Sequence, residues 1–188
     1  MEKRIKERML AEVRALDNDE NKMVVEGYAV VFENTTDLGY IKEVIDRNAF
    51  NECDMSDVCM KYNHEDNVLI MARTRNDSLQ LIVDDKGLKI RAELIDTQNN
   101  KDLYKMIQAR LLDKMSFAFT VKEEEMDYST DTRRILKIDK LFDVSVVDVP
   151  AYDATDIYAR SKEQYEKEKE EYNKLELEKQ KALALLSL

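Results

Sequence analysis

The chain contains one histidine, His64, which follows Tyr62 and Asn63. Histidine is the side chain whose unperturbed pKa suits proton transfer near neutral pH. If the protein is a hydrolase that uses a histidine base, that base must be His64. The question is then which hydroxyl it could activate and which carboxylate could orient it.

Ser116 and Asp143 are the candidates for the other two roles. Hydrolysis by a serine needs a base that takes the Oγ proton, an acid that orients the base, and N–H groups that hold the oxyanion. Ser116 opens an apolar run, residues 117–119, which would anchor its hydroxyl as a strand. Asp143 lies within another apolar run, where a carboxylate is costly to bury unless it has a partner such as an imidazole N–H.

The pattern leaves alternatives open. Ser145 alternates in its strand as well as Ser116 does, so it is a second candidate nucleophile. Asp148 and Asp153 compete with Asp143 for the acid role, and residues 65–66 could act locally on His64. The GxSxG nucleophile elbow is absent, which disfavours an α/β-hydrolase. The sequence pattern alone predicts a mixed β domain with a candidate Ser/His hydrolase site.

The composition narrows the class of protein. The 188 residues suffice for one domain and an appendage, and 44% hydrophobic residues is normal for a buried core. A net charge of −10 argues against a nucleic-acid partner. Cys53 and Cys59 are too few for a disulfide framework and, with one histidine, do not form a zinc site. The start of the chain lacks the apolar segment of a signal peptide, and no run is long enough to span a membrane, so we expect a cytoplasmic protein without metal or cofactor.

Period-two patterns predict mainly β structure. Residues 8–16 and 23–32 read as a hairpin, and residues 77–83 and 88–94 as a second hairpin around Asp84-Asp85-Lys86-Gly87. Further strands are expected over residues 40–45, 58–62, 116–121, 134–138 and 141–149, with Pro150 just after the last. His64 would then sit at the end of a strand.

Two helices and a tail complete the expected elements. Residues 46–50 are expected to open a short helix, and a longer amphipathic helix capped by Asn99 or Asn100 should run to Leu111. From about residue 160 to 188 there is no Gly or Pro, and Glu and Lys recur at i,i+4. We expect a protein domain over 1–159 and a charged helical tail over 160–188, either solvated or pairing with a partner helix.

Six blocks, in order, resemble the prohead maturation protease family of tailed bacteriophages: residues 26–32, 43–50, 63–65, 86–88, 115–119 and 143–152. The resemblance implies an α+β, mainly β fold similar to the herpesvirus assemblin proteases, with a β-barrel-like sheet wrapped by helices. It implies a serine peptidase with His64 as base, Ser116 as nucleophile and Asp143 as acid. Arg73 and Phe117 become candidates for holding the oxyanion or the substrate. The family often has Glu at the acid position and Gly or Ser before the nucleophile, where this chain has Lys114-Met115.

The resemblance also implies a biological role. Such proteases are enclosed in the procapsid, inside the host cytoplasm, and cleave the scaffolding segment, the major capsid protein and often themselves. The expected partners are therefore the major capsid protein with its scaffolding segment, and self-association is open. The tail could target the enzyme to the capsid or be removed by self-cleavage. The rival hypothesis is a non-catalytic capsid-assembly or scaffolding protein with a helical association tail.

Overall fold

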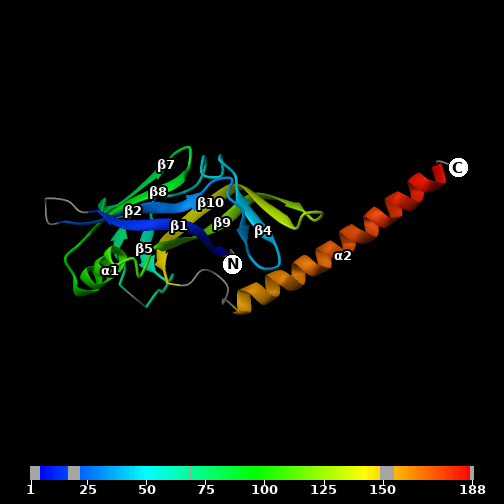
Figure 1. Cartoon of the computed structure of the whole chain (residues 1–188). Coiled ribbons are helices and arrows are strands. Elements are labelled where there is room, and N and C mark those ends of the chain that lie inside the picture. Colours follow the sequence, from blue (N-terminus) through cyan, green and yellow to red (C-terminus); the bar gives the residue numbers. More distant parts are fainter. Residues whose placement is uncertain (1–4, 17–21, 68, 149–154, 187–188) are drawn as a thin grey trace.

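This computed structural model describes residues 5–16, 22–67, 69–148 and 155–186. Ten strands among these residues form one sheet (Figure 1). The main path through the sheet is β3-β4-β10-β9-β1-β2-β8-β7, while β5 pairs with β10 and β6. The strands are β1 (Ile5–Leu16), β2 (Met23–Val31), β3 (Thr36–Asp37), β4 (Lys42–Ile45), β5 (Cys59–Tyr62), β6 (Ala72–Arg73), β7 (Leu79–Val83), β8 (Gly87–Leu94), β9 (Lys114–Asp127) and β10 (Thr132–Val147). The helices are α1 (Gln98–Gln108), α2 (Thr155–Leu186) and the 3₁₀ turn η1 (Thr74–Asn76).

The long strand β10 gives the sheet its barrel-like form. Its beginning pairs in parallel with β4 and its end pairs in parallel with β5, so two different strands share one edge of β10. β5 continues to β6, and β6 contacts β8, which is linked through β2 and β1 back to β9. The strands therefore surround a common core, which confirms the expected β-barrel-like, mainly β fold.

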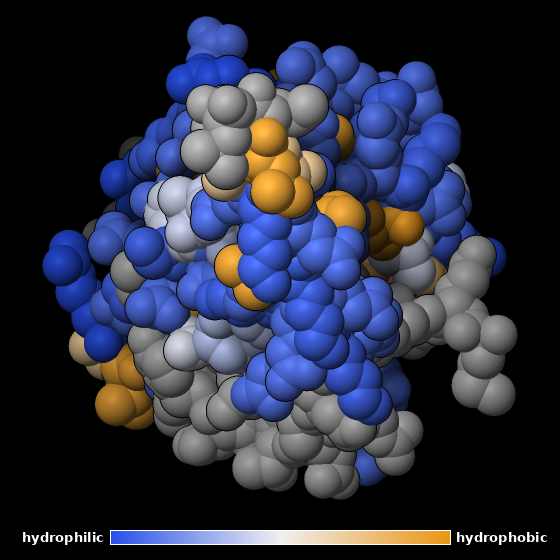
Figure 2. Space-filling model, turned by 90° about the vertical axis from the view of Figure 1, so that its right-hand side faces the viewer, coloured by the Kyte–Doolittle hydropathy of each residue, from blue (hydrophilic) through white to orange (hydrophobic). Residues whose placement is uncertain are grey.

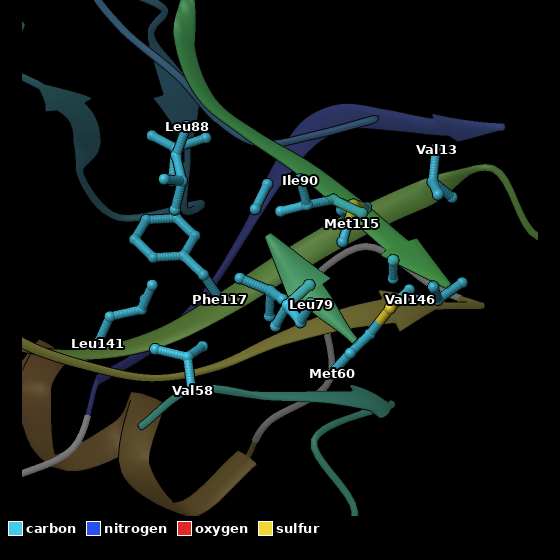
Figure 3. Packing of buried hydrophobic residues seen from close by; sticks show 14 of the residues in the cluster. Val13, Val58, Met60, Leu79, Leu88, Ile90, Met115, Phe117, Leu141 and Val146 are labelled. Atoms are coloured by element: carbon cyan, nitrogen blue, oxygen red, sulfur yellow. The ribbon is translucent and has the colours of Figure 1, made fainter. Parts of the chain in front are cut away.

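The core forms because alternate residues of these strands point to the same side. Met115, Phe117 and Phe119 of β9 are fully buried, and the rings of Phe117 and Phe119 stack with centroids 4.7 Å apart. Figure 3 shows Phe117 among side chains from β5, β7, β8 and β10. On β9, therefore, Ser116 must point to the opposite face from the core.

The two expected hairpins are confirmed, as is a strand that ends just before His64. The two strands expected over 134–138 and 141–149 are one element, β10, which pairs with β9 along its length through several register shifts. Pro150 lies outside the described residues. The expected helix at residues 46–50 is wrong: consecutive i,i+3 bonds end on Ala49, Asn51 and Cys53, and the Asp46 carboxylate accepts from the Asn48 N–H. Asp46 thus starts a series of turns rather than a helix.

The expected amphipathic helix is α1, with a different cap. Thr97 is the N-cap, and its side chain accepts from the N–H of Asn100. Asn100 is itself buried and donates its side-chain amide to the carbonyls of Met71 and Ile95. Asn100 therefore fastens α1 to the chain that follows His64, and α1 also contacts β1 and β2.

The tail is a single helix that begins at Thr155, five residues earlier than expected, and extends away from the barrel (Figure 1). Around α2 the exterior is mainly hydrophilic, with isolated apolar side chains (Figure 2). Within the described residues, no helix combines the length and apolarity that crossing a membrane would require.

Candidate active site

His64, Ser116 and Asp143 form a continuous hydrogen-bonded chain. His64 Nδ1 lies 2.5 Å from Asp143 Oδ1, and His64 Nε2 lies 2.6 Å from Ser116 Oγ. A carboxylate partner at Nδ1 assigns the proton to that nitrogen, because a carboxylate only accepts. Nε2 then accepts from the Ser116 hydroxyl, which is the arrangement a histidine base needs.

The strand register brings the three residues together. Ser116 of β9 is directly opposite Ser145 of β10, and Asp143 lies two residues earlier on the same face. β5 runs parallel to this part of β10, with Lys61 beside Ser145, so the chain leaves β5 next to the two hydroxyls. His64 follows within two residues of the end of β5 and reaches back over the pair.

A tight turn orients His64. The N–H of Glu65 donates to the Tyr62 carbonyl at 3.0 Å, and the two central residues, Asn63 and His64, have φ values of 50° and 58°. Two positive φ angles define a type I′ turn, a conformation that Asn tolerates better than most residues. The turn is fastened to the end of β10 because Asn63 N–H donates to Val146 O and Asn63 Oδ1 accepts from Asp148 N–H.

Asp143 has partners for both carboxylate oxygens. Oδ1 accepts from His64 and, at 2.9 Å, from the Ser145 hydroxyl, while Oδ2 lies 3.8 Å from Lys61 Nζ. Burial raises the pKa of Asp143, but the bonds from His64 and Ser145 and the charges of His64 and Lys61 outweigh it, so this pKa lies below its ordinary value. The acid is therefore held as an anion.

The site is closed in this structure. Ser116 and Ser145 are 0% exposed, and His64 and Asp143 are 3% and 4% exposed. In addition, β1 carries a bulge opposite Ser116, because Glu7 pairs with Phe117 and Leu10 with Met115. Two residues of β1 therefore face one of β9, which interrupts the regular ladder at the candidate nucleophile. A peptide can reach Ser116 only if neighbouring chain moves.

The side chains of the two candidates for oxyanion or substrate contacts, Arg73 and Phe117, have other partners. The Arg73 guanidinium forms a bidentate pair with Asp57, at 2.6 and 2.7 Å, and β6 is three strands from β9 across β5 and β10. An oxyanion role would require breaking that pair. The Phe117 side chain is in the core, on the face opposite to Ser116.

The structure separates the alternatives to the triad. Ser145 Oγ is near Nδ1, at 3.2 Å, while Nε2 contacts Ser116, so only Ser116 is placed to give its proton to the ring. Asp148 accepts from the Tyr62 hydroxyl, and Asp66 contacts Lys61 at 2.5 Å. Asp153 lies outside the described residues. No group of metal-ligating side chains occurs among the residues described.

Sequence reasoning did not assign the supporting contacts of Lys61, Asn63 and Ser145. Ser145 had a usable signal, since a hydroxyl two residues from an acid on a strand shares its face. The partners of Lys61 and Asn63 lie across β5 and β10, and no local pattern gives that register.

Comparisons with known proteins show the family and the fold of the chain. Residues 10–170 match the family described as caudovirus prohead serine protease. The chain is similar to the bacteriophage T4 capsid assembly protease gp21 with a TM-score of 0.52 and 14% identity, over 77% of this chain and 96% of that one. At that identity the likeness supports the fold. No curated protein matches the chain.

The family match covers most of the chain, including the elements that carry all three triad residues. Because the family is one of serine peptidases, the non-catalytic scaffolding hypothesis is not retained. Its name places such an enzyme in the phage prohead, where it acts on capsid proteins. The chain belongs to the caudovirus prohead serine protease family and is a serine peptidase of capsid maturation.

Proposed function

We propose that Ser116, His64 and Asp143 are the catalytic triad of this peptidase. The observation that carries the proposal is the buried chain of two short contacts, from Asp143 to His64 and from His64 to Ser116. No other described serine contacts Nε2 of the only histidine. The assignment therefore rests on geometry as well as on the family.

In this mechanism His64 Nε2 takes the Ser116 proton as Oγ attacks the peptide carbonyl. The imidazolium that forms is stabilised by Asp143 and then gives its proton to the leaving amine. Water next attacks the acyl-enzyme with His64 again as base. His64 must be neutral to act as the base.

The substrates we propose are the scaffolding segment and the major capsid protein, cleaved inside the procapsid while it assembles in the host cytoplasm. The support is the prohead setting of the family and the likeness to a protein named as a capsid assembly protease. The closed site is compatible with an enzyme held inactive until assembly, since Ser116 is fully covered. Its own chain is one further proposed substrate in the confined shell, cleaved by the same chemistry.

We further propose that the chain divides into a peptidase domain, residues 1–159, and a tail, residues 160–188, within the helix α2. Tyr165 and Lys169 of α2 contact Asp131 on the barrel, and the described side chains from residue 173 onward are mainly exposed. The tail is a targeting element for the capsid or scaffold, or a segment removed by self-cleavage.

The test is co-expression with the neighbouring capsid protein, comparing wild type with Ser116→Ala by intact-mass spectrometry. We expect shortened capsid protein with wild type and full-length protein with the variant, and the fragment masses give the cleavage site. Cleavage that survives in Ser116→Ala would refute the triad. Uncleaved capsid protein in both samples, with folded proteins, would refute the proposed substrate.

A further inference from the structure

We propose that Ser145 and Lys61 are positioning residues that hold Asp143 as an oriented anion, one at each carboxylate oxygen. The inference rests on the proposed triad and assigns a role to two side chains outside it. Ser145 donates to the same Oδ1 that accepts from His64, at 2.9 Å. Lys61 Nζ lies 3.8 Å from Oδ2.

Ser145 lies against the acid–base pair, near Nδ1 of His64 rather than Nε2. Its side chain is fully buried, on the strand β10 between β5 and β9. Its hydroxyl is 3.2 Å from His64 Nδ1 as well as 2.9 Å from Asp143, so it touches both members of the acid–base pair. A hydroxyl with these two neighbours fixes the rotation of the carboxylate about its Cβ–Cγ bond, and so fixes the ring that the carboxylate orients.

Lys61 supplies charge at the other oxygen. Asp143 is 4% exposed, and an ionised carboxylate so buried needs a compensating charge. Lys61 is held in place by Asp66 at 2.5 Å, and its side chain is itself mostly buried, at 15% exposed. The ammonium thus stabilises the Asp143 anion while opposing the second positive charge that appears when His64 is protonated.

The titratable and charged side chains near Asp143 lie on β5, on β9, after the turn that carries His64 and just after β10. Cys59 and Lys61 lie on β5, and Lys114 lies on β9. Glu65 and Asp66 follow the turn, and Asp148 follows β10. Of these, Lys61 is the one whose side chain forms an ion pair with Asp143. The pH effect is therefore assigned to it and to Ser145.

The two residues predict different changes in catalysis. Ser145→Ala removes a donor but little volume, so kcat should fall about tenfold with KM unchanged. The acid limb of the kcat/KM profile should move up by about half a pH unit, because the carboxylate then attracts the Nδ1 proton more strongly. Lys61→Met should move that limb up by about half to one unit because it removes the repulsion of the imidazolium. Lys61→Arg should restore the wild-type profile.

The experiment is the pH dependence of kcat and KM for these variants on a short peptide derived from the mapped cleavage site. Thr120→Val is the matched control, because it removes a buried β9 hydroxyl that has no hydrogen-bond partner, and it should keep the wild-type profile. Wild-type kcat and acid limb in both Ser145→Ala and Lys61→Met would overturn the inference. So would a rise in KM with kcat unchanged.

The proposal stays testable if Ser145→Ala does not fold, because the Lys61→Met and Lys61→Arg pair then decides it alone. Ser116→Ala separates this inference from the proposed triad. Peptide cleavage that persists in Ser116→Ala would refute the triad itself, whatever the Ser145 and Lys61 variants do. If Ser116→Ala is inactive while the Ser145 and Lys61 variants keep the wild-type kinetics, only the roles of Ser145 and Lys61 are refuted.

Discussion

The orientation of His64 depends on contacts at both ring nitrogens. Asp143 fixes the tautomer by accepting from Nδ1, which leaves Nε2 free to accept from Ser116. Asp143→Asn keeps the shape of the side chain but replaces an acceptor-only group by one that can donate, so the ring can adopt the wrong tautomer. We expect kcat to fall by about 10³- to 10⁴-fold, the range seen when a triad loses its acid, with KM little changed. Steady-state kinetics on the mapped peptide measures this.

The control for Asp143→Asn is the same change at another carboxylate near the site, Asp148. Asp148→Asn is suitable because Asp148 accepts from the Tyr62 hydroxyl, and its effect should be far smaller. A kcat for Asp143→Asn within tenfold of wild type would contradict the assignment of the acid.

A second buried carboxylate, Glu43, makes stability depend on pH. Burial raises the pKa of Glu43 to about 8, more than the neighbouring Arg133 lowers it. Between the unfolded value of 4.5 and about 8, the folded protein therefore holds a proton that the unfolded chain releases. The free energy of unfolding should fall with rising pH across this window, by up to about 1.4 kcal/mol per unit.

Glu43→Gln should remove this dependence. Urea unfolding of both proteins from pH 5 to pH 9 gives the difference in their free energies of unfolding. We expect the variant to gain stability relative to wild type as pH rises to about 8, and no further change above it. A constant difference across the range would contradict a protonated Glu43.

Two further residues show what sequence can predict at this scale. One histidine restricts the candidate base, and a family resemblance orders the other two candidates of the proposed triad. Arg73 could not be judged in the same way, since its carboxylate partner Asp57 is 16 residues away in sequence and meets it through the loop before β5. The direction of the Phe117 side chain follows from strand alternation alone, because the neighbour of Ser116 on a strand points its side chain to the other face.

Among the elements, the turn from Tyr62 to Glu65 has the most direct effect on catalysis. Ala at position 63 would have to adopt the left-handed conformation, at a cost of about 1–2 kcal/mol, and would lose the bond from Asp148 N–H. Gly tolerates the same φ but also lacks that bond. We expect melting temperatures in the order wild type, Asn63→Gly, Asn63→Ala, and a lower kcat in both variants because His64 is less firmly held.

Thermal unfolding and kinetics of the two variants measure these effects separately. Asn76→Ala is a control of the same chemical change at a surface turn after β6, distant in sequence from His64. If Asn63→Ala were as stable and active as wild type, neither the turn conformation nor its attachment to β10 would matter for His64.

The elements differ in how far sequence reveals them. The hairpin of β7 and β8 follows from a local turn signal and alternation, and it was predicted correctly. The continuity of β10 was not, because its bulges break the alternation between Ile135 and Asp143 and read as an interruption. The turns after Asp46 were missed because Asp opens either a helix or an Asx turn, and only the later hydrogen bonds separate the two.

At the scale of the whole molecule, α2 contacts the barrel at the end of β10 that lies far from the candidate active site. Thr132 begins β10 beside the contacts with α2, and Asp143 lies 11 residues further along the same strand, or roughly 35 Å at about 3.3 Å per residue. The helix and the triad thus occupy opposite ends of one strand. A change at the helix contacts should leave the chemistry at Ser116 unaltered.

Those contacts gather on the turn between β9 and β10. Asp131 accepts from the Tyr165 hydroxyl and from Lys169, each at 2.5 Å. The ring of Tyr128 stacks on Tyr165 and Tyr172, with centroids 6.1 and 5.2 Å away. These aromatic and ionic contacts, together with a ring contact between Tyr40 and Tyr165, join the barrel to the described side chains of α2.

Tyr128→Ala should therefore release α2 without affecting catalysis. We expect limited proteolysis within α2 to be about tenfold faster than in wild type, because each stacked aromatic pair contributes roughly 0.5–1.5 kcal/mol and two are lost. Cleavage of a short peptide should stay within twofold of wild type. Tyr28→Ala removes a ring from β2 that contacts Asp84 rather than α2, and should leave proteolysis of the helix unchanged. A loss of peptide cleavage in Tyr128→Ala would show that the helix supports the active site after all, and would contradict the division of the chain into a peptidase domain and a tail.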